Sequence, residues 1–319
     1  MAKKSTTEQQ AAGTAHKRQK LPLSGWLNLD KPLHVTSNDA VQVVKRALSP
    51  AKIGHGGTLD PLASGVLPLA FGEATKTVAY AMDGAKTYIA KVKFGAATST
   101  DDAQGEVIAE SKVRPAEILI QKALHDLSGQ TISQRPPAFS ALKVQGKRAY
   151  DLARQGKEVE LAARDVWLGS ARLLSFDGEV ADIELEVGKG FYVRSFARDL
   201  GERLRTRAHL VGLRRTRVGP FSIETAISLD SFLALDHRRA VPALLPLERV
   251  LDDIPALDLG QAEAWRLKMG LPATLVRRSF LPHMARLEDG QTVRARYDNR
   301  LIALCSYSKA RLKVIRGFN

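Results

Sequence analysis

The chain has 319 residues, of which 44% are hydrophobic, enough to bury one large core and a second, smaller one. Lysine and arginine together (48) exceed aspartate and glutamate (34) by 14, so the protein favours a polyanionic partner. This composition excludes a chain that is disordered throughout. It does not separate RNA, DNA and an acidic membrane surface as partners.

The sequence lacks the features of a membrane protein, a disulfide-bonded protein or a metalloprotein. No apolar run approaches the roughly 18 residues that cross a bilayer, and the N-terminal segment lacks the apolar core of a signal peptide. The single cysteine, Cys305, excludes an intrachain disulfide, and the histidines lack the spacing that zinc sites use. We therefore expect a cytoplasmic protein without a metal site.

The chain begins with a basic tail, followed by the first strand and helix. Residues 1–21 combine basic and small polar side chains, so we expect a flexible segment, either simply solvated or also touching RNA. Residues 26–29 are predicted to form a strand, with Lys31 in the loop after it. Ser37 is expected to cap a helix whose buried face consists of Val41, Val44 and Leu48.

The middle of the chain alternates helices and strands. Helices are expected over residues 74–82 and 116–127, and a strand over residues 86–94. The apolar face of that strand consists of Tyr88, Ala90, Val92 and Phe94. A proline pair within residues 134–143 favours a loop.

A further strand and helix complete the large domain. Residues 182–187 alternate charged and apolar side chains, as a half-buried antiparallel strand does. A Gly-Lys-Gly turn then leads into a helix with Arg194 in its first turn. Because the elements lack regular βαβ spacing, residues 22–250 are expected to form an α+β domain with a mixed, largely antiparallel central sheet.

Residues 251–319 are expected to form a separate, small β-rich module. A short helix is predicted over residues 261–269, and strands over residues 284–288, 291–297, 300–306 and 310–316. Two pairs of residues are typical of hairpin turns between these strands: Asp289-Gly290 and Asp298-Asn299. A basic module of this kind either binds RNA or acts as an inert stabilising cap.

The most distinctive segment is Gly54-His55-Gly56-Gly57-Thr58-Leu59-Asp60-Pro61. Its glycines allow positive φ and the close approach of a ligand, and Pro61 disfavours helical geometry at Asp60. The segment lacks the Gly-Lys-Ser/Thr ending of a phosphate-binding loop. Local chemistry leaves two interpretations of Asp60 open: a turn residue before proline, or a catalytic carboxylate.

A longer stretch around Asp60 resembles a known catalytic motif. Residues 57–67, Gly-Thr-Leu-Asp-Pro-Leu-Ala-Ser-Gly-Val-Leu, are similar to the motif of the bacterial TruB family, the tRNA pseudouridine-55 synthases. In the family's order and spacing, the likeness continues through residues 25–32, 140–143, 189–194 and 213–215. It covers residues 22–230 strongly, and residues 251–319 resemble the family's PUA-like module through diffuse motifs.

The resemblance implies a pseudouridine synthase fold with its active site in a central cleft. It implies isomerisation of one uridine, at position 55 in the T-arm loop of tRNA. The base would flip out, and the glycosidic bond would break and re-form through C5 with the help of an aspartate. No cofactor is implied. We expect a monomer whose partner is tRNA, with no protein partner.

Two other hypotheses compete with this one. The first is an RNA-binding module or folding chaperone that holds and releases tRNA without catalysis. The second is a guide-RNA-dependent relative that works inside a ribonucleoprotein. The short C-terminal module argues against the second hypothesis.

Three residues take catalytic roles through the family likeness. Asp60 would assist cleavage of the glycosidic bond by attacking the sugar, attacking the base or removing a ribose proton. Arg194 would orient this carboxylate and stabilise its charge. Tyr88 would stack on the uracil and reach the C5 proton. Read locally, Arg194 is an ordinary arginine at a helix start and Tyr88 is a core tyrosine.

Five further residues resemble the family's RNA and substrate contacts. His55 would meet the flipped loop nucleotides rather than transfer protons. Lys31 would line the cleft, and Tyr192 and Leu213 would form the pocket wall around the uracil. Lys143 resembles part of a flexible RNA-clamping segment, and its competing interpretation is a solvated loop lysine.

The densest charge lies in one stretch of arginines, which suits a surface that follows RNA phosphates. Its members are Arg194, Arg198, Arg203, Arg205, Arg207, Arg214, Arg215 and Arg217, opposed locally by Asp199 and Glu202. We expect a minority of them to touch RNA. Residues 98–105 resemble the family's acidic loop, but Gln104 stands where an acid is common, so Asp102 is a weaker match than Asp60.

Overall fold

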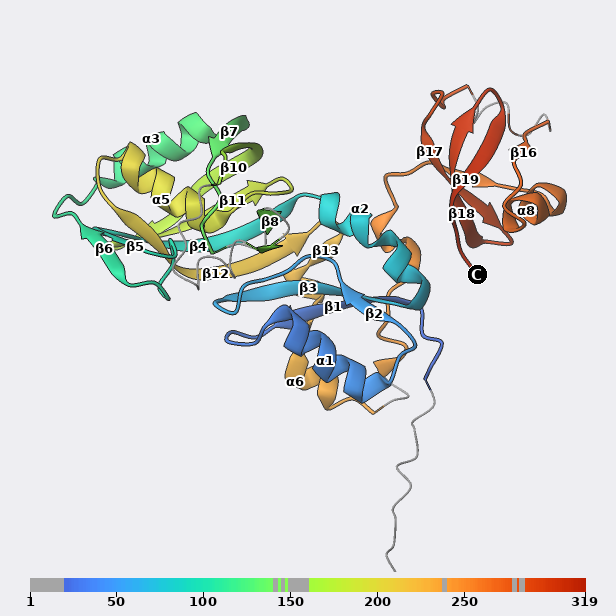
Figure 1. The fold of residues 1–319 in the computed structure, drawn as a ribbon, viewed down its shortest axis with the longest axis horizontal. Helices are drawn as coiled ribbons and strands as arrows, with labels where there is room; N and C mark the ends of the chain where they lie inside the picture. The colour runs from blue at the N-terminus through green and yellow to red at the C-terminus, as the bar shows by residue number, and fades with distance from the viewer. Residues whose placement is uncertain are drawn as a thin grey trace, which may run out of the picture.

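The computed structural model describes residues 20–139, 143–144, 147–148, 161–236, 240–276, 280 and 285–319. Within them the chain forms a large lobe around one sheet and a smaller C-terminal lobe (Figure 1). Nearly all of the predicted tail, and residues 140–142 of one matching motif, lie outside the described residues.

The sheet of the large lobe has the order β14-β1-β3-β12-β4-β11-β10-β7, with β2 beside β3 and β13 beside β12. Its strands are β1 (Gly25–Lys31), β2 (Ile53–His55), β3 (Ala63–Phe71), β4 (Lys86–Phe94), β7 (Gln130–Gln134), β10 (Arg164–Phe176), β11 (Val180–Val187), β12 (Ala208–Val218), β13 (Phe221–Ser222) and β14 (Ile227–Ser228). Among these described strands, β1 pairs with β14 and β3 with β12 in parallel, and the remaining pairs are antiparallel. The predicted mixed, largely antiparallel sheet is confirmed.

Helices cover different parts of the sheet. They are α1 (Ser37–Leu48), α2 (Val78–Asp83), α3 (Glu117–Leu127), α5 (Val193–Arg203) and α6 (Leu229–Leu233), with the 3-10 helices η1 (Gly72–Thr77), η2 (Ile223–Thr225) and η3 (Leu247–Val250). Figure 1 shows α3 and α5 together over the half of the sheet that contains β10 and β12, and α1 and α6 beside β1. Small hairpins are formed by β5 (Ala96–Thr98) with β6 (Val107–Glu110), and by β8 (Lys143–Val144) with β9 (Lys147–Arg148).

The strands at the centre of the lobe are buried on both faces. Leu27 and Leu29 of β1 enter the main core with α1, whereas Trp26 enters a second cluster with residues of β3, η1 and α2. The strand β3, buried along almost its whole length, is an almost continuous run of apolar and small residues. Such runs lack the alternation that identifies a half-buried strand, which is why β3 was not predicted.

Several predicted elements are confirmed and others need correction. The bounds of β4 and the start of α5 match the predictions. The cap of α1 is Thr36, whose hydroxyl accepts a hydrogen bond from the Asp39 N–H, so the prediction of Ser37 was wrong. Lys31 ends β1 rather than lying in the following loop. The helix predicted over residues 74–82 is the 3-10 helix η1 followed by α2.

The C-terminal lobe is a five-stranded sheet with one helix, α8 (Gln261–Lys268). Its strands, in the order β15-β17-β18-β19-β16, are β15 (Ala256–Asp258), β17 (Thr292–Tyr297), β18 (Arg300–Ser308), β19 (Arg311–Gly317) and β16 (Ala273–Thr274). Residues 285–288 do not form the predicted strand, whereas Asp298 and Asn299 form the predicted turn with positive φ. The β-rich character of this module is confirmed.

The C-terminal residues attach the small lobe to the large one. Phe318 is 4% exposed and packs in a cluster with Tyr80 of α2. Lys76 of η1 donates a hydrogen bond to the Gly317 carbonyl at 2.9 Å, and the Asn319 N–H donates one to Glu73 at 2.9 Å. Among the described residues, no helix has the length and apolar character needed to cross a membrane.

Candidate active site

Asp60 lies on the loop between β2 and β3, and contacts from other elements hold this loop in place. Ser37, buried at the start of α1, accepts a hydrogen bond from the Leu59 N–H at 2.8 Å and donates one to the Leu59 carbonyl at 2.9 Å. The His34 N–H donates to the Pro61 carbonyl at 2.8 Å. Because the residues on either side of Asp60 are anchored, its carboxylate projects from a constrained backbone.

The glycines of the segment have different roles. Gly57 has a φ of 126°, which favours glycine, whereas Gly54 and Gly56 do not have positive φ. Of the three glycines, Gly57 alone uses the expected freedom to adopt a positive φ.

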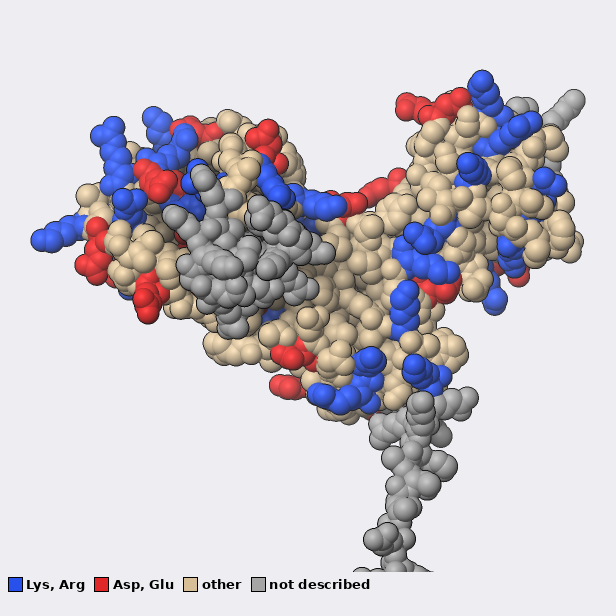
Figure 2. Space-filling view, viewed as in Figure 1, with Lys and Arg blue, Asp and Glu red and all other residues tan. Residues whose placement is uncertain are grey.

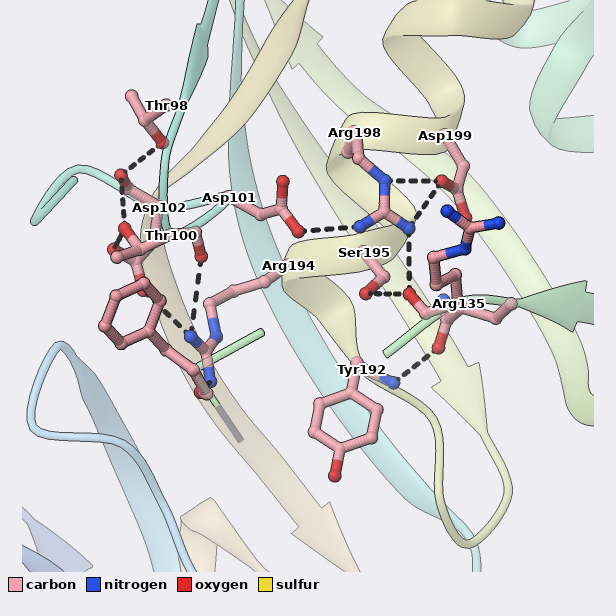
Figure 3. Close-up of polar contacts among 12 residues, drawn as sticks. Thr98, Thr100, Asp101, Asp102, Arg135, Tyr192, Arg194, Ser195, Arg198 and Asp199 are labelled. Carbon is pink, nitrogen blue, oxygen red and sulfur yellow. Dashed lines mark hydrogen bonds and ion pairs between the residues drawn. The ribbon is translucent and has the colours of Figure 1, made fainter. Parts of the chain in front are cut away.

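Arg194 brings together two carboxylates from distant parts of the chain. Its side chain is 10% exposed, and Nη2 lies 3.1 Å from Oδ2 of Asp60. Nη1 lies 3.5 Å from Oδ2 of Asp102, and the Phe139 carbonyl accepts a hydrogen bond from Nη2 at 3.1 Å. Figure 3 shows the guanidinium projecting from α5 toward the loop of Asp102. The predicted pairing of Asp60 with Arg194 is thus present as a charge-assisted contact.

Asp102 is a more integral part of this cluster than the sequence indicated. Its Oδ1 accepts hydrogen bonds from the Thr100 hydroxyl at 2.6 Å and from the Gln104 N–H at 3.0 Å. The loop is joined to β12, because the Ala103 N–H donates to the Leu210 carbonyl at 2.9 Å. The unusual Gln104 does not disturb this arrangement, since its contact to Asp102 uses the main chain.

A pocket opens beside Asp60, where several elements of the large lobe meet. It is lined by Asp60, Leu62, Ala63, Asp102, Arg194, Leu210, Gly212 and Leu213. The Asp60 side chain is 47% exposed, whereas those of Arg194 and Asp102 are almost fully buried. Apolar walls with one exposed carboxylate suit a planar base attached to a sugar.

Tyr88 lies beneath this region on β4. In the sheet it is the direct neighbour of Leu185 on β11 and of Arg215 on β12. Its ring is 9% exposed and belongs to the main core, and it is not among the residues that line the pocket. This position matches the core interpretation, and the catalytic role of Tyr88 stays a prediction.

Lys31 is buried next to the site. Its Nζ donates hydrogen bonds to the carbonyls of Pro32 at 2.8 Å and Val35 at 2.7 Å. Burial and the charge of Arg215 lower the pKa of Lys31 to about 8, against an opposing effect of Asp60. In this structure the ammonium group supports the loop after β1 from inside.

His55 ends β2 beside the same loop. Its Nδ1 accepts a hydrogen bond from the Gly57 N–H at 3.3 Å. Burial, followed by the charge of Arg215, lowers the pKa of His55 below its usual value. The ring is therefore uncharged near neutral pH, which fits a contact residue better than a general acid.

The other predicted contact residues surround the pocket to different extents. Leu213 lines the pocket directly. Tyr192 immediately precedes α5, and its N–H donates to the Gln134 side chain at 2.8 Å. Lys143 lies in β8 and pairs with Arg148 of β9, but its side chain lies outside the described residues.

The arginine stretch is largely neutralised by carboxylates from elsewhere in the chain. The pairs are Arg194 with Asp60 and Asp102, Arg198 with Asp101 and Asp199, Arg203 with Asp126, Arg207 with Glu202, and Arg214 with Asp30. Figure 2 shows mixed positive and negative side chains on the α3 and α5 side of the large lobe. The expectation that only Asp199 and Glu202 oppose this stretch was wrong, because folding brings five further aspartates, distant in the sequence, into contact with it.

Sequence reasoning missed the role of Arg215, which it assigned to the charged surface. Arg215 is 1% exposed and its guanidinium lies beneath the Asp60 loop. A signal was available: Arg215 lies two residues after Leu213, so both belong to the same face of a strand. That signal required β12 to be predicted as a strand.

Solved structures show the class of protein to which this fold belongs. A chain of an H/ACA RNP bound to a substrate RNA containing 2′-deoxyuridine matches with a TM-score of 0.69 at 23% identity, covering 92% of this chain and 85% of that chain. A chain of a Cbf5-Nop10-Gar1 complex also matches with a TM-score of 0.69, at 25% identity and the same coverage. The protein has the pseudouridine synthase fold with a C-terminal β half-barrel module.

Sequence comparisons identify the family. The profile of the TruB family pseudouridylate synthase N-terminal domain matches residues 45–193, and that of the tRNA pseudouridylate synthase B C-terminal domain matches residues 194–252. The tRNA pseudouridine synthase B of Rhodospirillum rubrum is 45% identical over 96% of this chain and 99% of its own length. That of Caulobacter sp. (strain K31) is 46% identical over 93% of this chain and 96% of its own length. The chain belongs to the TruB family of pseudouridylate synthases, which are isomerases.

Proposed function

We propose that the protein converts uridine 55 in the T-arm loop of tRNA into pseudouridine. The observation that carries the proposal is the 3.1 Å ion pair between Asp60 and Arg194 beside a pocket with apolar walls. The relatives at 45% and 46% identity are named tRNA pseudouridine synthase B, which supports tRNA as the substrate. The chain from the H/ACA RNP structure is more distant, at 23% identity, so it gives less support to a guide-dependent enzyme.

The proposed reaction begins with extrusion of the target base, at a cost of a few kcal/mol that contacts with the pocket offset. The bond from C1′ to N1 then breaks, the uracil turns, and a bond from C1′ to C5 forms. C5 loses its proton and N1 gains one, so the product is an isomer of the substrate. Asp60 assists cleavage by one of the three routes described above, and Arg194 keeps its carboxylate in one orientation.

The remaining predicted residues act on the substrate around this pair. Leu213 and Tyr192 form the wall beside the uracil, and His55 meets the nucleotides displaced from the loop. Tyr88 reaches the uracil if bound RNA widens the pocket toward β4. Lys31 supports the cleft wall, and Lys143 contributes to the segment that clamps the RNA.

The two lobes are proposed to have different roles. Residues 22–250 act as the catalytic domain and residues 251–319 as an RNA-binding module. The change from one sheet to the other between β14 and β15 supports this division. The junction of the two family profiles, between residues 193 and 194, instead falls in the first turn of α5, inside the large lobe.

The test of the proposed function uses the purified protein alone with an isolated T-arm stem-loop that contains C5-tritiated uridine. We expect the release of one tritium per RNA, because isomerisation removes the C5 hydrogen at a single position. Binding without release would contradict the proposed function and favour the chaperone hypothesis. Release that requires an added guide RNA would favour the ribonucleoprotein hypothesis.

A second prediction concerns the salt dependence of RNA binding. The net charge of +14 is expected to neutralise several phosphates. If three or more phosphates are contacted, a plot of the logarithm of affinity against that of salt concentration should have a slope of about −2 or steeper. Filter binding of the stem-loop from low to high salt measures this slope. A flat response would contradict a binding surface based on charge.

A further inference from the structure

A single arginine holds the main chain on both sides of Asp60. Arg215 lies on β12, and its Nε donates a hydrogen bond to the Val66 carbonyl at 2.8 Å. Its Nη1 reaches the Thr58 carbonyl at 3.4 Å and its Nη2 the Gly57 carbonyl at 3.1 Å. The guanidinium therefore ties the chain before Asp60 to the strand after it.

The backbone around Arg215 is shaped for this contact. Gly65 of β3 has a φ of 105°, and a Cβ atom there would lie 2.1 Å from the Arg215 carbonyl. No side chain other than that of glycine fits this distance. The strands β3 and β12 can thus run in parallel close enough for Arg215 to reach beneath the Asp60 loop.

Burial of the Arg215 guanidinium costs free energy that its contacts with this loop must offset. The side chain is 1% exposed, and the described residues include no carboxylate in an ion pair with it. A buried charge without a counterion is unfavourable and must be stabilised by hydrogen bonds. Carbonyls of the Asp60 loop and of β3 accept these hydrogen bonds. The bonds that stabilise the buried charge therefore also hold the loop in place.

The charge of Arg215 also acts on neighbouring bases. It contributes to the lowered pKa of Lys31 and of His55, which flank the Asp60 loop, although burial is the larger cause in both. Arg215 therefore has an electrostatic effect that can be measured separately from its hydrogen bonds.

We infer that Arg215 is a positioning residue for the reaction: by binding main-chain carbonyls on both sides of Asp60, it fixes the carboxylate in reach of Arg194 and the pocket. This inference rests on the proposed function. It assigns Arg215 to the interior of the active site and not to the surface that contacts RNA.

The main test replaces Arg215 with lysine, which keeps the charge but loses the planar fork that reaches several carbonyls. We expect the single-turnover rate constant of tritium release to fall about 10²-fold, as a misplacement near 1 Å causes. The Kd for the stem-loop should change less than about twofold, since the side chain does not face RNA. Arg114→Lys is the control, because Arg114 also binds main-chain carbonyls, those of Ser111 and Val113, away from the site. A wild-type rate in Arg215→Lys would overturn the inference.

A measurement without substrate separates this inference from the proposed function. Amide hydrogen exchange at Leu59 reports the order of the loop, and we expect faster exchange in Arg215→Lys than in Arg114→Lys or the wild type. Unchanged exchange would overturn the inference, even if the wild type proved inactive on the stem-loop. Wild-type inactivity alone would contradict only the proposed function.

A third measurement tests the effect of the Arg215 charge on the pKa of His55. In Arg215→Met the positive charge is lost, so the pKa of His55 should rise toward its usual value, whereas in Arg215→Lys it should stay lowered. NMR titration of the His55 ring measures this difference. An equal His55 pKa in the wild type and Arg215→Met would overturn the proposed placement of Arg215. If Arg215→Met does not fold, the inference is still tested by Arg215→Lys, through the single-turnover rate constant and amide exchange at Leu59.

Discussion

Replacing Asp60 with asparagine is expected to abolish turnover while leaving RNA binding intact. Asparagine keeps the size of the side chain but removes its negative charge. Arg194 contacts this charge at 3.1 Å, and the exposed side of the pocket presents the same charge to substrate. We expect the single-turnover rate of tritium release to fall by about 10⁴-fold, the upper end of the range for one positioned acid or base. The Kd for the stem-loop should stay within about twofold, because Asp60 contributes to the reaction and not to phosphate binding.

The control for this experiment is Asp182→Asn. Asp182 lies on β11 of the same sheet and pairs with Lys91 at 2.9 Å, outside the pocket. This variant should keep the wild-type rate. Turnover that survives in Asp60→Asn would exclude Asp60 as the catalytic group, whichever of the three routes the reaction follows.

Replacing Arg194 with lysine is expected to have the next largest effect. The guanidinium contacts Asp60 with one terminal nitrogen and Asp102 with the other, and a single ammonium group cannot reproduce this fork. Because Asp60 then loses its fixed orientation, the single-turnover rate should fall about 10²-fold or more. Tritium release and filter binding on the same RNA measure the rate and affinity.

Arg194→Met should add a loss of stability to the loss of rate. Removing the charge leaves the buried Asp102 without its cation, and such a change costs roughly 3–5 kcal/mol. We therefore expect a clear decrease in Tm for Arg194→Met and a smaller one for Arg194→Lys. Arg172→Lys is the control, since Arg172 forms an exposed pair with Glu184 on the same sheet. A wild-type rate in Arg194→Lys would show that the pair is structural.

Local patterns predicted some elements well because those elements face solvent on one side. The strand β4 alternates buried and accessible residues along its length, so its period is visible in the sequence. The helix α5 presents a regular apolar face, and its first turn contains Arg194 as expected. The strands β3 and β12 lack such a pattern, since one is buried on both faces and the other contains arginines that the fold partly buries.

In the candidate site, too, the sequence predicted the roles of some residues and missed that of another. Asp60 and Arg194 were identified by motifs in separate parts of the chain, and their contact agrees with that prediction. Arg215 was assigned to the charged surface, because a run of arginines is usually solvated. Its burial depends on main-chain carbonyls, and a sequence contains no information on which carbonyls will point at a given side chain.

The amino-acid sequence was sufficient to predict the family and the α+β class, and to single out Asp60 as the proposed reactive carboxylate, because these depend on a contiguous motif and on local periodicity. The partners of that carboxylate required the folded chain. The contacts of Arg194 with Asp102 and of Arg215 with the Asp60 loop join residues that are 92 or more positions apart. Such contacts arise from the pairing of β12 with β3 and β4, and the free energy that decides this pairing comes from burial over the whole sheet rather than from any one segment.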